Sequence, residues 1–311
     1  MADMLVMGVD ENGLGPRLGP LVATSLTLET PRYARSELCQ RGLRLGLTDS
    51  KETGGFGRMG FIESIALALL RAGEGGADPG SADGLLDRVF PGIRPRLGAC
   101  CPDAPTAEQC WGVDLDLPVF GGDPDFGQEL LERLVGRSGL RIVDVQSRIA
   151  CAGVLNAKSA AGRNKLDVDL ELFEDLIEGV RTRHGAPLLV FCGMIGGIRD
   201  YASRFGRFET KRVTELRGRR GQRRYSVDGL GEVRFEVDAD ARHLPVALAS
   251  IAGKYVREIC MRRIGEFYRR TDPELVLASG YHDPVTTRFI QATELSRRRL
   301  GIAQDCFRRQ A

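Results

Sequence analysis

The spacing of apolar and polar residues changes along the chain, and each spacing predicts either a strand or a helix. Residues 4–10 form a short apolar run, and residues 20–29 (PLVATSLTLE) are β-branched and partly alternating. Both segments are predicted to be strands, and the glycines and prolines between them suit a tight antiparallel connection. Residues 140–156 resemble a strand that runs into a loop, and residues 187–194 (PLLVFCGM) a buried central strand.

The remaining periodic segments predict helices and one strand pair. GQRRYSVDG and GEVRFEVDAD predict paired strands with Asp-Gly as the turn signal. Helical periodicity is found at 61–73, at 165–185, at 245–270 and over roughly 284–299. A strand hairpin followed by alternating helices and strands predicts an α/β or α+β layer fold with a mixed sheet.

The segment 74–127 differs from the rest of the chain in amino-acid composition. It is rich in glycine and proline, and it holds three cysteines and Trp111, the chain's one tryptophan. We expect it to be an insertion or lid with little regular structure, inside a single domain that spans residues 1–311. Two readings of its cysteines stay open, because Cys100, Cys101 and Cys110 are either reduced thiols or part of a zinc site.

Composition limits the class of protein more than its function. Of the 311 residues, 42% are hydrophobic and 28% charged, which is typical of a soluble globular protein. The chain has no long apolar stretch, no signal peptide and no CxxC pair, so we expect a cytoplasmic protein without a membrane partner, and a monomer.

Positive charge is concentrated in one segment, although the formal net charge is only +2. Residues 211–225 (KRVTELRGRRGQRRY) include Arg217, Arg219 and Arg220. This segment is interpreted either as an exposed phosphate-binding arm or as a solvated flexible loop.

Three acidic residues are candidates for a metal site. Asp10 and Glu11 end the first predicted strand, where a charge is costly unless it is paired, and Asp240 comes just before the small-residue helix. A hard divalent ion takes oxygen ligands from several such strand ends. The alternatives are a structural salt bridge for the pair and an ordinary helix N-terminal acid for Asp240.

Four segments carry a resemblance to a known family. GVDENGLGP, LTDSK, ADARHLPVALASIAGKYVRE and ASGYHDPVTTRF resemble, in the same order, motifs of the type 2 ribonucleases H, that is ribonuclease HII and its HIII relatives. They reach both ends of the chain and leave its middle uncovered. The resemblance implies a ribonuclease H-like fold, with a five-stranded mixed sheet flanked by helices.

The resemblance also implies an activity and a set of site residues. Members of this family cut the RNA strand of RNA/DNA hybrids, or of DNA that contains ribonucleotides, with two Mg²⁺ or Mn²⁺ ions. Asp10 would bridge the two ions, and Glu11 and Asp240 would complete part of the metal shell. These three residues are therefore the expected catalytic and metal-binding residues.

The same motifs imply substrate contacts. Backbone groups of Gly13, Leu14 and Gly15 would approach the 2′-hydroxyl that distinguishes RNA from DNA. Tyr281 would pack on a deoxyribose, and Lys51 and Lys254 are candidates for phosphate contact. The alternatives are a plain tight turn, a half-buried core tyrosine and ordinary surface charge.

The chain departs from the family pattern at the end of the central strand. The expected acid falls on Gly193, or on Cys192 in the other register, and neither is a carboxylate. Asp200 is a possible replacement if its loop doubles back, and Asp114 or Asp116 could also serve. Leu14 stands where the family has arginine. Three functions remain open: an active nuclease, a catalytically silent protein that binds hybrid or structured nucleic acid, and an interaction scaffold.

Overall fold

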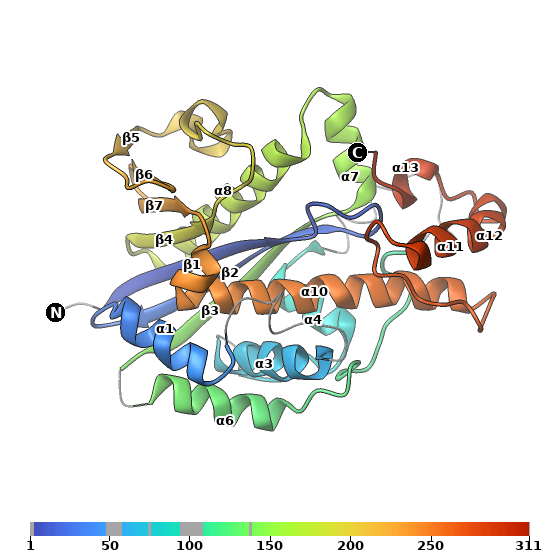
Figure 1. Ribbon diagram of the computed structural model, residues 1–311, viewed down its shortest axis with the longest axis horizontal. Coiled ribbons are helices and arrows are strands. Elements are labelled where there is room, and N and C mark those ends of the chain that lie inside the picture. Colours follow the sequence, from blue (N-terminus) through green and yellow to red (C-terminus); the bar gives the residue numbers. More distant parts are fainter. Residues whose placement is uncertain (1–2, 48–57, 74–75, 94–107, 137–138, 311) are drawn as a thin grey trace.

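A single seven-stranded mixed sheet runs through the computed structural model, which describes residues 3–47, 58–73, 76–93, 108–136 and 139–310 (Figure 1). The strand order is β3-β2-β1-β4-β7-β6-β5. The strands are β1 (Met4–Asn12), β2 (Leu21–Thr30), β3 (Arg141–Ala150), β4 (Leu188–Gly193), β5 (Val213–Leu216), β6 (Gln222–Val227) and β7 (Gly231–Glu236).

Strand direction determines which residues meet at the edge of the sheet. β1 pairs antiparallel with β2, and β2 with β3, whereas β1, β4 and β7 are parallel neighbours. The carboxyl ends of β1, β4 and β7 therefore lie side by side. Residues that follow these three strands are brought together there, although they are far apart in the sequence.

The prediction of a mixed α/β sheet is confirmed, but the expected count of five strands is wrong. β6 and β5 continue the sheet antiparallel beyond β7. β6 and β7 are the strand pair predicted from GQRRYSVDG and GEVRFEVDAD, whereas β5 lies in the part of the basic segment that we expected to be a loop. In β6, Tyr225 and Val227 are buried while Arg224 and Ser226 are not, as the alternation of a strand requires.

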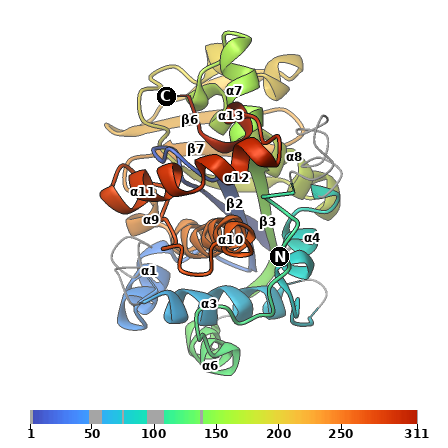
Figure 2. The ribbon, with the colours of Figure 1, turned by 90° about the vertical axis from the view of Figure 1, so that its right-hand side faces the viewer.

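Helices cover both faces of the sheet. Figure 1 shows α10 against one face with α3 and α6 behind it, and α8 on the other face; Figure 2 shows the same layers end-on. The helices of the first half are α1 (Arg35–Arg44), α3 (Met59–Ala72), α4 (Ala82–Val89), α6 (Pro124–Val135), α7 (Ala152–Ala160) and α8 (Lys165–His184). Those of the second half are η1 (Ala202–Arg204), η2 (Arg207–Thr210), α9 (Ala239–Arg242), α10 (Leu244–Arg269), α11 (Pro284–Ala292), α12 (Glu294–Arg299) and α13 (Gln304–Phe307).

Local signals explain where α8 begins and ends. The Asn164 side chain accepts the N–H of Asp167, and the Asp167 carboxylate accepts the N–H of Asn164, which forms a capping box. Gly185 ends the helix in the left-handed conformation, with φ at 68°, as the sequence predicted. The predicted last helix is divided at Thr293 into α11 and α12, and β3 is followed by α7 where we expected a loop.

The middle segment contains one helix that its composition did not indicate. Residues 82–89 form α4, whose Leu85, Leu86 and Val89 are buried in the main core. Residues 94–107, with Cys100 and Cys101, lie outside the described residues.

A helix that crosses a bilayer needs about 20 predominantly apolar residues. Across the described part of the chain, no helix is both long enough and apolar enough to cross a membrane.

Candidate metal centre and nucleic-acid interface

The carboxyl end of β1 places Asp10 and Glu11 at the edge where the parallel strands finish. Both side chains are half-buried. A Cβ built on Gly193, at the end of β4, would lie 2.8 Å from Oδ1 of Asp10 and 3.7 Å from Oε2 of Glu11. The position at which the resemblance implies an acid therefore faces this pair, and the glycine there carries no carboxylate.

Asp240 lies at the same edge, in the single turn of α9 that follows β7. Its Oδ1 accepts the N–H of Ala241 at 2.9 Å, and the side chain is half-buried. β1 is held against the start of α10, because Gly8 touches the backbone of Pro245 so closely that a Cβ would not fit. This close approach brings the turn that carries Asp240 to the strand that carries Asp10.

A fourth carboxylate, Asp169 of α8, faces the pair from the other side of the sheet. Its side chain is fully buried, and neither carboxylate oxygen has a hydrogen-bond partner among the described residues. Burial first, and then the negative charges of Glu11 and Asp10, raise the pKa of Asp169 well above its ordinary value. Burial likewise raises the pKa of the Cys192 thiol, with further contributions from Asp10 and Asp169.

The sequence contained a signal for Asp169 that our reading missed. The core-facing side of α8 carries Asp169, Phe173, Ile177 and Val180, spaced by three or four residues. Packing of the hydrophobic core does not explain an aspartate on the apolar side of such a helix. The signal was hidden because acidic residues are frequent on the other faces of the same helix.

The donor set at this edge fits a divalent metal ion. Asp10, Glu11 and Asp169 are close enough for their charges to act on one another, and nothing among the described residues bonds to the oxygens of Asp169. Carboxylate oxygens are the ligands that Mg²⁺ and Mn²⁺ prefer, and a cation would offset their mutual repulsion. Within the described ranges, no three His, Cys, Asp or Glu side chains already form a metal-binding group.

The other candidate acids lie elsewhere. Asp200 is exposed just before η1, where its Oδ1 accepts the N–H of Ser203 at 3.4 Å. Asp114 accepts the N–H groups of Asp83 and Leu115 beside α4.

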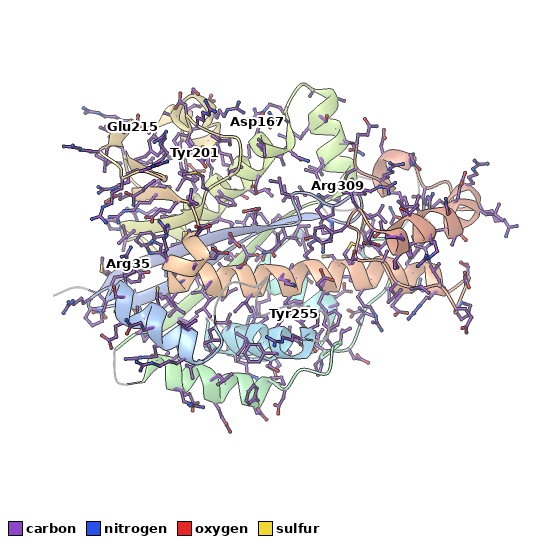
Figure 3. All side chains as sticks on the ribbon, in the orientation of Figure 1. Arg35, Asp167, Tyr201, Glu215, Tyr255 and Arg309 are labelled. Carbon is purple, nitrogen blue, oxygen red and sulfur yellow. The ribbon has the colours of Figure 1, made fainter. Side chains whose placement is uncertain are left out.

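The glycine-rich turn between β1 and β2 is held by the buried Arg309, whose position Figure 3 shows. Its Nη1 donates to the carbonyl of Gly13, and its Nε donates to the carbonyl of Gly19 at 2.8 Å. A Cβ on Gly13 would lie 2.7 Å from Nε of Arg257, and the φ of Gly13 is +93°. Gly13 is therefore required by the turn itself.

Gly15 differs from Gly13 because it has open space around it. A Cβ built there would meet nothing within 4 Å. Gly15 and Leu14 line a cleft of about 680 Å³, to which Arg17, Lys165 and Arg308 contribute positive charge. The exposed backbone of this turn thus faces a basic cleft.

Tyr281 is attached to the same turn. The carbonyl of Gly280 accepts the N–H groups of Arg17 at 2.8 Å and Leu18 at 3.1 Å. The half-exposed ring of Tyr281 lies 4.8 Å from the guanidinium of Arg257, a cation–π contact.

Of the two lysines predicted to contact phosphate, only one lies among the described residues. Lys254 is half-buried on α10, next to Gly253, which packs against Asn12 and Thr24 near the end of β1. Lys51 lies outside the described residues, together with most of LTDSK.

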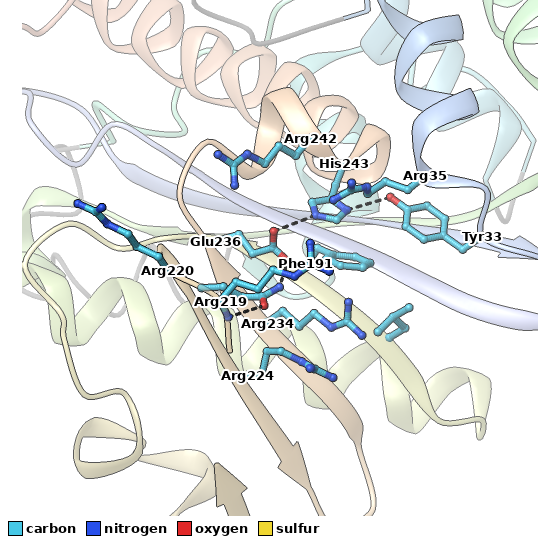
Figure 4. A pocket seen from close by; sticks show the side chains of 12 residues that line it. Tyr33, Arg35, Phe191, Arg219, Arg220, Arg224, Arg234, Glu236, Arg242 and His243 are labelled. Atoms are coloured by element: carbon cyan, nitrogen blue, oxygen red, sulfur yellow. Dashed lines mark hydrogen bonds and ion pairs between the residues drawn. The ribbon is translucent and has the colours of Figure 1, made fainter. Parts of the chain in front are cut away.

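The basic segment is placed beside the sheet. Arg217, Arg219 and Arg220 are exposed in the turn between β5 and β6, and Arg219 and Arg220 line a pocket near the end of β7 (Figure 4).

No protein-family model matches the sequence, and no curated protein matches it. Several solved structures match this chain. Ribonuclease HII of Archaeoglobus fulgidus, in a complex with PCNA, has a TM-score of 0.45 and 18% identity over 99% of this chain and 98% of its own. Ribonuclease H2 of Pyrococcus horikoshii OT3 has a TM-score of 0.46 and 16% identity over 98% and 92%. Bst ribonuclease HIII in complex with Mn²⁺ has a TM-score of 0.47 and 15% identity over 99% and 66%.

These are type 2 ribonucleases H. They are the family that the four sequence motifs resemble. At this level of similarity the structures say nothing about activity, so the function is argued from the motifs and from the geometry of the site.

Proposed function

We propose that this protein is a divalent-metal-dependent endonuclease that cuts the RNA strand of RNA/DNA hybrids, or of DNA that contains ribonucleotides. The observation that carries the proposal is the buried carboxylate of Asp169 beside Asp10 and Glu11, with no hydrogen-bond partner among the described residues. Such a group is costly in a core unless it has a function or a cation beside it.

The chain's own carboxylates would hold the metal. Asp10, Glu11 and Asp240 keep the roles that the resemblance implies, and Asp169 supplies the acid that Gly193 lacks. Bound Mg²⁺ or Mn²⁺ lowers the pKa of a coordinated water and stabilises the leaving 3′ oxygen. Cys192 is a poor substitute because its thiol is buried, protonated and soft.

The glycine turn would select the ribose. Arg309 fixes the backbone of the turn by hydrogen bonds and Arg257 packs beside Gly13, while Gly15 leaves its own side of the turn open to the basic cleft. A backbone group presented in this way can bond a 2′-hydroxyl without reading the base. Tyr281 borders the turn, where it could pack on a sugar, and Lys254 lies where it could contact a phosphate.

Cleavage is the direct test of this function. A labelled RNA/DNA hybrid and a DNA duplex with one ribonucleotide are incubated with the protein in Mg²⁺ and separately in Mn²⁺. We expect cutting on the RNA strand, or at the ribonucleotide, that falls at least about 100-fold in Asp10→Asn. Cleavage that persists in Asp10→Asn would show a contaminating nuclease or another site, and would contradict the proposal.

One observation favours a second function. Gly193 removes the family acid, and no complete metal-binding group exists among the described side chains. A protein that binds hybrids but does not cut them would show tight binding without cleavage in either metal, with cleavage appearing in Gly193→Asp.

A further inference from the structure

A second basic site lies beside the acidic edge, in a pocket of about 380 Å³ over β4, β6 and β7 (Figure 4). Glu236 is the one carboxylate among its twelve lining residues. Six of the lining residues are arginines, contributed by α1, the β5–β6 turn, two strands and α9: Arg35, Arg219, Arg220, Arg224, Arg234 and Arg242.

The positive charge of this pocket is not balanced within the described part of the chain. Arg224 and Arg234 stand directly opposite each other on β6 and β7, an arrangement that is destabilising for like charges. Both donate to the same oxygen, Oε1 of Glu232, at 2.7 and 2.8 Å. One carboxylate therefore forms ion pairs with two guanidinium groups.

The remaining four arginines of the pocket are exposed. Among the described residues, no acidic side chain forms an ion pair with any of them. These residues are Arg35, Arg219, Arg220 and Arg242. An anion in the pocket would supply the missing negative charge.

Glu236 does not supply it, because the carboxylate is already engaged at the floor of the pocket. It accepts from Nε2 of Gln222 at 2.6 Å and from Nε2 of His243 at 3.2 Å. Burial alone would raise the pKa of Glu236, but these hydrogen bonds outweigh it and lower the pKa to about 2. Burial lowers the pKa of His243, whose Nδ1 is hydrogen-bonded to the hydroxyl of Tyr33 at 3.1 Å.

Among the described residues that line the pocket, the aromatic rings of Tyr33 and Phe191 contact each other and His243. The ring of Phe191 is stacked on His243, with 3.7 Å between centroids, and the guanidinium of Arg234 lies 5.1 Å from its centre. Phe191 is buried. The pocket thus offers guanidinium N–H groups without a stacking platform, which suits a phosphate and not a nucleobase.

Its position connects the pocket to the acidic edge. Glu236 pairs in register with Gly193, whose Cβ position faces Asp10. Arg242 follows Asp240 by two residues in the same turn of α9. A second hollow of about 370 Å³ shares Arg35, Arg219 and Arg242 and extends past Cys39.

We propose that this arginine pocket binds a backbone phosphate of the nucleic-acid strand that occupies the acidic edge. The contact would set the register of the strand without reading its sequence. The inference rests on the proposed function for the identity of the strand, and on the pocket's own geometry for the phosphate.

The first test measures equilibrium binding of an RNA/DNA hybrid in EDTA, where no cleavage occurs, over a series of salt concentrations. Arg219→Gln/Arg220→Gln is compared with Arg133→Gln/Arg299→Gln, which removes the same charge from exposed positions on α6 and α12. We expect the pocket variant to bind about tenfold more weakly and its salt slope to fall by about 1. Equal slopes for the two variants would overturn the inference.

A second measurement identifies the phosphate. Single methylphosphonates, which are neutral, replace successive phosphates of the hybrid. We expect one substitution, within a few nucleotides of the cut site, to weaken binding to the natural protein but not to Arg219→Gln/Arg220→Gln. If no substitution behaves in this way, while inorganic phosphate raises the melting temperature of the natural protein alone, the pocket is a site for a free anion and the inference fails.

These outcomes are separate from the fate of the nuclease proposal. Binding in EDTA does not depend on Asp10 as a metal ligand. A protein that fails to cleave can still show the expected salt slopes, and a protein that cleaves can still show equal slopes.

Discussion

At the scale of single residues, two glycines of one turn have different reasons to be glycine. Gly13 has φ at +93°, and its missing Cβ makes room for Arg257, so the fold requires it. Gly15 has empty space around it, so the fold does not require a glycine there. The proposed contact of this turn with a 2′-hydroxyl explains why residue 15 is a glycine.

Substitution separates these two requirements. We expect Gly13→Ala to lower the free energy of unfolding by about 1–3 kcal/mol, through backbone strain and collision with Arg257. Gly15→Val should leave stability within about 0.5 kcal/mol and weaken hybrid binding, because its side chain projects into the cleft. Denaturant melts and hybrid titrations measure both effects. Unchanged binding by a folded Gly15→Val would remove this turn from the interface.

At the scale of elements, one buried carboxylate joins α3 to the segment before α6. Glu63 is fully buried in α3. It accepts N–H groups from Val119 at 2.6 Å, Phe120 at 2.7 Å and Gly122 at 2.9 Å, and the hydroxyl of Tyr255 at 3.1 Å. These bonds hold part of the middle segment against the core.

Removal of this carboxylate should be costly. We expect Glu63→Ala to lower the free energy of unfolding by about 3–5 kcal/mol, because it leaves three part-buried N–H groups and a buried tyrosine hydroxyl without their acceptor. Glu129→Ala, an exposed position on α6, is the control and should change stability by less than about 0.5 kcal/mol. A similar small change in both variants would show that the segment is held by other contacts.

Elements with a strong period were predictable from the sequence, and those whose charges hide the period were not. Residues 165–185 predicted α8 and its end at Gly185, since periodicity and a terminal glycine are local signals. β5 was missed because its four residues have no apolar alternation and depend on β6 as a partner. α4 was missed because glycines and prolines around it suggested a loop, whereas burial of Leu85 and Leu86 stabilises it.

At the scale of the whole molecule, the parallel order β1-β4-β7 organises the proposed interface. It places Asp10, Gly193 and Asp240 after three neighbouring strands, and the arginine pocket beside the last of them. The motifs identified Asp10, Glu11 and Asp240 as candidates because each sits at a strand or helix end. Asp169 could not be identified in this way, because its relation to Glu11 exists only once α8 packs on the sheet.

The central claim is that Asp169 serves in place of the acid missing at Gly193. Mn²⁺ titration followed by electron paramagnetic resonance, which reports the free ion, tests it without requiring catalysis. The proteins compared are the natural chain, Asp169→Asn, Asp169→Asn/Gly193→Asp, and Asp200→Asn as a control at the exposed alternative acid.

We expect Asp169→Asn to bind Mn²⁺ at least about tenfold more weakly, as loss of a ligand or of its supporting partner usually does. Gly193→Asp in that background should restore binding, since its Cβ position faces Asp10 and Glu11. Asp200→Asn should bind as the natural chain does. Unchanged Mn²⁺ affinity in Asp169→Asn would contradict the claim and leave the buried carboxylate without a part in the site.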